Sequence, residues 1–342
     1  MTERVGIGIV GAGLIVEHAH LPAYRSAGLT VCGVFDQDHA RASRLAAEFG
    51  VQAYRSLDEL VEDEGVHIVD CAVTPDAQEN LVPQFLDAGK HVLCQKPLAD
   101  SLEGARNLVE RAHESGLKLA VNQQMRWEPT IQEMKRRLID GRIGEPVLLS
   151  CRLNFMGEYP GPHWLNDLDR LFVRFGTIHY IDSARYLFGE PSRVTARLLR
   201  DKVQHAAGET FINAWIEWPN GATMVAFERY TCKTGDIECD IRLEGTRGAV
   251  KGRLGLYLDY PAPHADVIEA VQYGDPEWTL VSDTETWLPG AFAKPMLSLI
   301  DAVQTNGEPA TSGRDNLRTL RIVEALYESD RLGRTVTLDA KE

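Results

Sequence analysis

Apolar runs alternate with amphipathic segments through the first third of the chain, from Val5 to about Asn122. The runs predict short buried strands, and the segments between them predict helices, two of which end at Gly89 and Gly116. Such alternation is typical of a parallel sheet with helices on both faces. The predicted strands are residues 5–10, 29–35, 51–54, 68–73, 91–94 and 117–121, and the predicted helices reach residue 24 after the first strand and then span 38–48, 57–63, 78–88 and 102–115.

The pattern changes after Arg126, where longer strands replace the short buried ones. Tight turns such as Pro219-Asn220-Gly221 separate several of them, which is typical of antiparallel hairpins. The C-terminal part of the chain returns to a helical pattern. The predicted strands of this part are 147–154, 192–199, 210–218, 222–230, 236–244 and 249–254, and the predicted helices are 134–139, 177–188, 295–304 and 314–332.

A glycine pair, Gly11 and Gly13, follows the first predicted strand at the point where the chain turns into a helix. The first glycine permits a tight turn, and the second lets the backbone approach a pyrophosphate at the helix N-terminus. The second strand ends at Asp36, about 20 residues later, the spacing of a carboxylate that hydrogen-bonds an adenosine ribose. The third fingerprint position is Val16 in place of Gly or Ala, so helix and strand cannot approach as closely there.

These elements predict the fold class. We expect an α/β Rossmann-type domain with a parallel sheet over residues 1–124, which binds a dinucleotide. An α+β domain with a large open, mainly antiparallel sheet is expected over residues 125–342, with C-terminal helices that pack back.

Charge near Asp36 predicts which dinucleotide is bound. Asp38 adds a second negative charge beside the expected ribose 2′-hydroxyl, and a 2′-phosphate there would meet like charge. NAD is therefore favoured over NADP. Arg41 and Arg44 argue the other way, although their place on the following helix favours a solvent-facing role.

Composition limits the remaining function classes. The chain has 342 residues, 44% of them hydrophobic, enough for two domains with substantial cores. A formal charge of −14 without any basic block argues against nucleic acid and anionic membrane surfaces as partners. The absence of a signal pattern, of a membrane-spanning apolar run and of paired cysteine spacings favours a cytoplasmic protein with reduced thiols and no zinc site. No carboxylate stands at ligand spacing from His18 and His20, so no metal site is predicted.

The segment Ala88-Gly89-Lys90-His91-Val92-Leu93-Cys94-Gln95-Lys96-Pro97-Leu98-Ala99 resembles the glucose-fructose oxidoreductase / inositol dehydrogenase / MocA family, whose members usually carry Glu-Lys-Pro there. Nearly the whole chain fits the resemblance, including His20-Leu21-Pro22, Thr74-Pro75 and the turn at 244–248. It implies an NAD(P)-dependent oxidoreductase acting on a carbohydrate-like substrate. It also implies a homodimer or homotetramer formed through the open sheet. The implied cofactor-binding residues are Gly11, Gly13, Leu14, Ile15, Asp36, Thr74, Pro75, Gln95, Lys96 and Asn122.

Lys96 and His179 are the predicted catalytic residues. Lys96 ends a strand of the parallel sheet, where ligands of such sheets bind, and partial burial beside the nicotinamide cation would lower its pKa from about 10.4. Gln95, in place of the usual Glu, removes a carboxylate that would have raised it. His179 can exchange protons near neutrality. Asp182 lies three residues further along the predicted helix and either orients the imidazole or pairs structurally.

Several positions depart from the family pattern. Phe175 occupies the place of the usual aspartate four residues before the histidine, and Arg170-Leu171-Phe172 replaces a glycine-rich stretch. Glu79 stands near the place of a common histidine. The predicted substrate-binding residues are Lys96, Arg126, Asn154, Trp164, His179 and Asp182, with Tyr159, His163 and Arg170 as further candidates.

Three functions remain open from the sequence. The first is an NAD-dependent dehydrogenase that takes a hydride from a secondary hydroxyl of a sugar, polyol or sugar-derived acid. The second is an NAD-dependent lyase, epimerase or glycosidase that oxidises its substrate only transiently, which the missing aspartate at Phe175 motivates. The third is a non-catalytic NAD- or sugar-binding protein.

Overall fold

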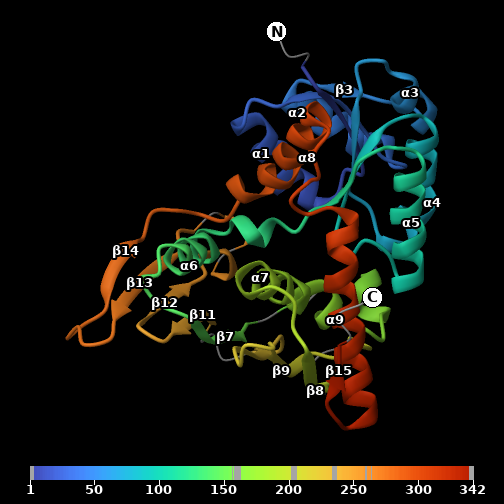
Figure 1. Cartoon of the computed structure of the whole chain (residues 1–342). Coiled ribbons are helices and arrows are strands. Elements are labelled where there is room, and N and C mark those ends of the chain that lie inside the picture. Colours follow the sequence, from blue (N-terminus) through green and yellow to red (C-terminus); the bar gives the residue numbers. More distant parts are fainter. Residues whose placement is uncertain are drawn as a thin grey trace. The chain divides into compact units, whose positions relative to one another are not determined.

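The structure, a computed structural model, describes residues 4–155, 157, 163–201, 206–232, 237–258, 260–262 and 264–338. The chain divides into two compact units (Figure 1). One comprises Met1–Gln124 with Leu288–Arg318, and the other comprises Met125–Trp287 with Thr319–Glu342. The last long helix therefore contributes to both units.

The first unit contains a six-stranded sheet in the order β3-β2-β1-β4-β5-β6, with every pair parallel. Its apolar strands, such as the fully buried β1, follow from the continuous hydrophobic runs in the sequence. The order reverses beside β1, and ligands of such sheets bind outside the carboxyl ends of the strands at this point. The strands are β1 (Gly6–Val10), β2 (Thr30–Phe35), β3 (Gln52–Ala53), β4 (Ile68–Cys71), β5 (His91–Cys94) and β6 (Leu119–Val121).

Helices connect these strands, and polar side chains begin several of them. Asp38 accepts hydrogen bonds from two amides at the start of α2, and Ser101 caps α5 in the same manner. The helices are α1 (Leu21–Ser26), α2 (His39–Phe49), α3 (Leu57–Glu62), α4 (Pro75–Asp87), α5 (Leu102–Glu114) and α8 (Ala293–Thr305), with a π-helical turn at Val16–His20 and a 3-10 turn at Gly290–Phe292.

The second unit contains a nine-stranded sheet in the order β14-β13-β12-β11-β7-β10-β9-β8-β15. All its pairs are antiparallel except β7 with β10, so the predicted open, mainly antiparallel sheet is confirmed. The strands are β7 (Pro146–Asn154), β8 (Arg193–Leu199), β9 (Phe211–Glu217), β10 (Thr223–Arg229), β11 (Glu238–Gly245), β12 (Gly248–Arg253), β13 (Val267–Gln272), β14 (Thr279–Ser282) and β15 (Val336–Thr337).

Three helices accompany this sheet: α6 (Pro129–Ile139), α7 (Ile178–Phe188) and α9 (Gly313–Leu332), of which α9 joins this unit from Thr319 onward. A π-helical turn, Val173–Thr177, leads into α7, and short 3-10 turns lie at Gln124–Trp127, Trp164–Asp167 and Gly255–Tyr257. Within the described ranges, no helix combines the length and apolar character needed to cross a membrane.

Candidate active site

The glycine turn after β1 has the geometry of a dinucleotide cradle. Gly11 adopts a φ of +106°, and a Cβ there would lie 2.4 Å from the carbonyl oxygen of Ala72, so only glycine fits. A Cβ on Gly13 would meet no atom within 4 Å, which leaves open space above the turn. The helix begins directly afterwards, and the amides of a first helical turn have no intrahelical acceptor. Leu14 is 67% exposed beside this space, so the residues present fit an NAD molecule.

Asp36 connects the second strand to this turn. Its Oδ2 accepts a hydrogen bond from the Ala12 amide at 2.6 Å, and its Oδ1 accepts one from the Asp38 amide at 2.8 Å. Asp38 caps α2, a role that the sequence analysis did not assign, and pairs with Arg41 at 3.1 Å. Arg44 binds Glu17 at 2.7 Å. Both arginines are thus engaged with carboxylates, which agrees with the charge argument for NAD.

Val16 lies in the π-helical turn Val16–His20 and is fully buried. A valine occupies more volume than the usual glycine, and the helix is locally wider here than an α-helix. Val16 was expected to prevent a close approach of helix and strand, and the helix is π-helical rather than α-helical at this residue.

A buried polar network lies around His20, which was not predicted as a site residue. The imidazole Nδ1 donates to Asp70 Oδ2 at 2.6 Å, and Tyr24 OH donates to the same oxygen at 2.8 Å. In this tautomer Nε2 is an acceptor, and it lies 2.6 Å from Gln95 Nε2 and 3.0 Å from Asn122 Nδ2. Gln95 and Asn122, both predicted to bind cofactor, thus meet at one histidine.

Two acceptors in this network have no hydrogen-bond partner among the described residues. They are the buried Oδ1 atoms of Asp70 and Asn122. A water or a polar group of a bound cofactor would satisfy them. Thr74 and Pro75 lie at the neighbouring strand end, where Thr74 precedes α4 and Pro75 is its first residue. Within the described part of the chain, no cluster of His, Cys, Asp and Glu has the geometry of a metal site.

Lys96 follows β5 in the turn Gln95–Leu98, and the Lys96–Pro97 peptide bond is cis. Burial lowers the pKa of the Lys96 ammonium to about 8, because an ammonium loses hydration energy away from water. A lysine with this pKa can exist as a neutral amine near physiological pH and accept a proton. Perturbed groups of this kind are enriched at functional sites.

His179 lies in the second unit, on the first turn of α7, and is buried. Its ring packs edge-on against Trp287, with centroids 6.1 Å apart. Phe175 lies in the preceding π-helical turn, and its ring contacts Trp164 edge-on at 5.5 Å. An aromatic contact therefore occupies the position where the family usually places a carboxylate.

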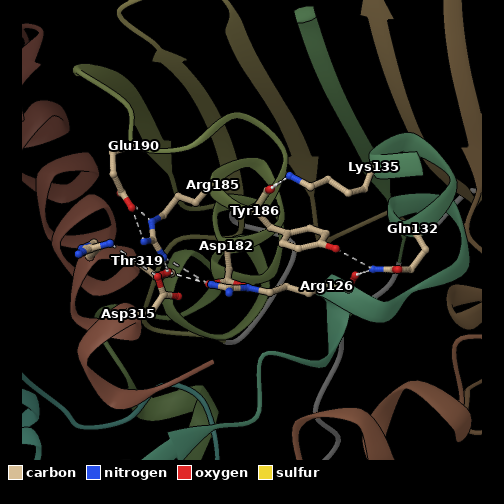
Figure 2. Close-up of polar contacts among 10 residues, drawn as sticks. Arg126, Gln132, Lys135, Asp182, Arg185, Tyr186, Glu190, Asp315 and Thr319 are labelled. Carbon is tan, nitrogen blue, oxygen red and sulfur yellow. Dashed lines mark hydrogen bonds and ion pairs between the residues drawn. The ribbon is translucent and has the colours of Figure 1, made fainter. Parts of the chain in front are cut away.

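Arg126 and Asp182 lie together in the same unit (Figure 2). The guanidinium donates from Nε to Oδ2 at 2.6 Å and from Nη2 to Oδ1 at 2.8 Å, and both side chains are buried. Thr319 Oγ1 also donates to Oδ1, and Arg185 donates to Thr319 at 2.7 Å. The structure therefore supports the structural reading of Asp182, and the substrate contacts predicted for this pair stay predictions.

Further predicted substrate residues of this unit have contacts of their own. Arg170 binds Glu324 at 2.7 Å and covers the ring of Tyr327. His163 begins the turn Trp164–Asp167, where Trp164 is exposed, whereas Tyr159 lies outside the described residues. The strand register places Asn154 beside Arg229 and Glu238, on the sheet face opposite to the buried Leu153. Their substrate contacts stay predictions.

Glu228 is a buried acid that the sequence analysis missed. It lies on β10, and its Oε2 accepts hydrogen bonds from Thr177 Oγ1 and Tyr230 OH, both at 2.7 Å. Burial raises the pKa of Glu228 to about 7, despite the two hydrogen bonds that lower it. Thr177 ends the π-helical turn that precedes His179, so Glu228 anchors this turn to the sheet.

The parallel sheet with its glycine turn, joined to a second unit with an open sheet, defines a nucleotide-dependent oxidoreductase of two domains. The chain belongs to the glucose-fructose oxidoreductase / inositol dehydrogenase / MocA oxidoreductase family. Residues 5–123 match the family's NAD-binding Rossmann fold, and residues 135–338 match its C-terminal alpha/beta domain. The predicted family, fold class and NAD-binding domain are thereby confirmed, and the chain is an enzyme of this sugar and polyol oxidoreductase family.

Individual relatives span nearly the whole chain. D-apiose dehydrogenase from Paraburkholderia graminis is 32% identical over 341 residues, which cover 98% of this chain and 90% of the relative. Inositol 2-dehydrogenase from Rhizobium meliloti is 26% identical over 96% of this chain and 97% of the relative. A crystal structure of an oxidoreductase from Agrobacterium radiobacter in complex with NAD+, L-tartaric acid and magnesium has a TM-score of 0.85 and 27% identity, covering 98% of each chain.

Proposed function

We propose that this protein is an NAD-dependent dehydrogenase that removes a hydride from a secondary hydroxyl of a sugar, polyol or sugar-derived acid. The observation that carries this proposal is Lys96, whose pKa is lowered by burial to about 8 at the carboxyl end of β5. Proton removal from an alcohol requires a base that is neutral near the working pH. The parallel sheet supplies Lys96 at the edge where its ligands bind.

We assign cofactor binding and proton transfer to different residues of the chain. The turn at Gly13 and the helix after it hold the pyrophosphate, and Asp36 accepts hydrogen bonds from the ribose. Lys96 accepts the hydroxyl proton at Nζ, and the positive charge that it gains stabilises oxygen charge during the reverse step. Bound NAD supplies the hydride acceptor at nicotinamide C4. His179 is the second candidate for proton exchange with the substrate.

The relatives indicate which substrates to try first. The 32% identical relative is named D-apiose dehydrogenase, and another similar protein is named inositol 2-dehydrogenase. The structure with 27% identity contains L-tartaric acid, a hydroxy acid. We therefore propose an aldose as the substrate, with D-apiose first, and polyols and sugar acids as the next classes.

The test is direct. Purified protein is examined by native mass spectrometry for bound NAD and is then incubated with NAD and each candidate, while reduced nicotinamide is followed by its absorbance. Accumulation of NADH with one substrate supports the dehydrogenase. Product formation without NADH would favour transient oxidation, and Lys96→Ala with full turnover would overturn the assignment of Lys96.

We also propose that the protein forms a homodimer or homotetramer through the outer face of the nine-stranded sheet. Trp215 on β9 and Phe227 on β10 are 44% and 42% exposed there, and Leu199 on β8 is exposed as well. Large exposed apolar residues gathered on neighbouring strands are typical of protein interfaces. The register places Trp215 opposite Val225 and Phe227 opposite Asn213, so these side chains share one face.

A further inference from the structure

Gln78, on the first turns of α4, is fully buried against the turn that carries Lys96. Its Oε1 accepts a hydrogen bond from the Gln95 amide at 2.6 Å. Its Nε2 lies within hydrogen-bond distance of three carbonyl oxygens, those of Gln95 at 3.1 Å, Pro97 at 3.0 Å and Leu98 at 3.2 Å. One side chain thus bonds the backbone on both sides of Lys96.

Gln78 adds to the other contacts of this turn. The Gln95 amide also lies 3.2 Å from the Cys71 carbonyl oxygen, whereas β5 ends at Cys94 and Pro97 has no amide hydrogen to donate. Buried carbonyl and amide groups without partners cost free energy, so the turn requires a donor for its carbonyls and an acceptor for the Gln95 amide. A primary amide provides a donor and an acceptor on one planar group. An ionised carboxylate can only accept hydrogen bonds, and a thioether is a weak acceptor with no donor.

The side chain of Gln95 adds a second attachment. It bonds His20, which is held in turn by Asp70. The turn is therefore fixed through its backbone by Gln78 and through the Gln95 side chain by His20, so the residue between these attachments has little freedom to shift.

We propose that Gln78 is a positioning residue for Lys96: it fixes the turn 95–98 so that the amine is held at one place in a partly desolvated setting. This inference rests on the proposed function only for its effect on turnover. The effect of Gln78 on the position and titration of Lys96 can be measured in the protein without substrate. Within this unit the titratable groups next to the turn are His20, which bonds the Gln95 side chain, Asp70 and Tyr24, which join His20 in its network, and Cys71 and Cys94 at the adjacent strand ends. The side chain of Gln78 bonds only backbone groups of the turn among the described contacts.

The experiment uses the full chain with Gln78→Met, which removes all four hydrogen bonds at similar volume, and Gln78→Asn, which adds no charge and whose amide, one methylene shorter, cannot make the same set of hydrogen bonds. Gln84→Met is the matched control, since Gln84 is exposed on the same helix and bonds only Asn80 of its own helix among the described contacts. Two readouts are taken. The first is the Lys96 titration in the free protein, followed by NMR of 13C-methylated lysines, with the signal assigned by its loss in Lys96→Arg. The second is kcat, KM and NAD affinity.

For Gln78→Met we expect the Lys96 midpoint to move from about 8 toward the ordinary lysine value of about 10.4, because a loosened turn admits water. We expect kcat to fall about 100-fold, the effect of a small misplacement of a reacting group, with NAD affinity retained. Gln78→Asn should shift the titration in the same direction, and Gln84→Met should change neither readout.

Folded Gln78 variants with the wild-type Lys96 midpoint would overturn the proposal, even if their thermal stability is reduced. If Gln78→Met does not fold, Gln78→Asn decides by the same readout. If no substrate reduces NAD with the wild-type protein, the proposed function fails, whereas the Lys96 titration still decides the role of Gln78.

Discussion

Arg126 holds the carboxylate of Asp182 by two parallel hydrogen bonds, of 2.6 Å and 2.8 Å, in the interior of the second unit (Figure 2). Geometry of this kind matches the fork of a guanidinium to both oxygens of a carboxylate. Thr319 donates to the same carboxylate, and Arg185 is 3.7 Å from it. Since both charges are buried and satisfied by one another, the first consequence of removing either one should be a loss of stability.

Arg126→Met should lower the free energy of unfolding by about 3–5 kcal/mol, because it leaves the Asp182 carboxylate buried without its partner. The double variant Arg126→Met/Asp182→Leu should recover much of that loss, since it removes both charges together. Urea denaturation of the two single variants and the double variant measures this coupling. Single variants with wild-type stability and a raised KM would instead establish the substrate contacts predicted from the sequence.

The rate of alcohol oxidation should depend on Lys96. Below about pH 8 the ammonium is protonated and cannot accept the hydroxyl proton, so kcat/KM should rise with pH and level off above about 8. Lys96→Arg keeps a charge that does not dissociate and should lose about 10²–10⁴-fold in kcat, while NAD affinity is retained. Lys294→Arg, on the exposed side of α8, is the control. A profile without this rise would exclude Lys96 as the base.

Asp36 should set both the affinity for NAD and the discrimination against NADP. Asp36→Asn keeps an acceptor for the Ala12 amide but removes the charge, whereas Asp36→Ala removes both. Loss of hydrogen bonds to a charged group costs about 1.5–3 kcal/mol, so NAD should bind about 10–100-fold more weakly to Asp36→Ala. NADP should be affected less. Titration calorimetry with both cofactors tests this, and an unaltered ratio of affinities would contradict the role of Asp36.

The outer sheet face predicts how the protein assembles. Replacing Trp215 and Phe227 together by Glu should reduce the mass of the particle measured by light scattering, because two charges would be placed in the proposed interface. Ile139→Glu introduces a charge at an exposed site at the end of helix α6, and should leave the mass unchanged. A monomeric wild-type protein would refute the proposal.

Much of the fold could be predicted because its strong signals are local. The apolar run 91–94 coincides with β5, and the pattern over 314–332 coincides closely with α9. Three short strands, β13, β14 and β15, were not predicted. β14 has only four residues, mostly exposed, and β15 has two, so neither carries a hydrophobic pattern that distinguishes a strand from a loop. β15 also pairs with β8, which lies far away in the sequence.

The candidate site could likewise be predicted only where its signals are local in the sequence. Gly11, Asp36 and Lys96 could be proposed from the sequence because their predicted roles depend on position at a strand end. Partners across long sequence separations could not be found in this way: Arg126 and Asp182 are 56 residues apart, and no local pattern links them. The same limit explains why Glu228 was missed, since its contact with Thr177 spans 51 residues. A lone glutamate in a strand pattern gives no indication that it is buried.

Glu228 should make stability depend on pH. Its folded-state pKa, about 7, lies above the ordinary value of 4.5, so the native state retains a proton that the unfolded chain releases. The stability that this proton contributes is fully present below about pH 4.5 and is lost as pH rises through 7. Tyr180 and Tyr230 nearby have pKa values raised well above 10 and remain neutral in this window.

Glu228→Gln cannot ionise, and its amide oxygen can still accept hydrogen bonds from Thr177 and Tyr230. Relative to the wild type, its free energy of unfolding should therefore increase between pH 4.5 and 7 by on the order of 3 kcal/mol and stay level above that range. Urea unfolding at pH 5, 6, 7 and 8 measures the difference, with Glu328→Gln on the exposed side of α9 as the control. Among the described residues, Oε1 of Glu228 has no hydrogen-bond partner, and any fixed cost of placing an amide there shifts the free energy of unfolding equally at every pH. The change of the difference with pH therefore tests the proton. Parallel curves for the two proteins would mean that Glu228 does not hold a proton in the native state at pH 5–6.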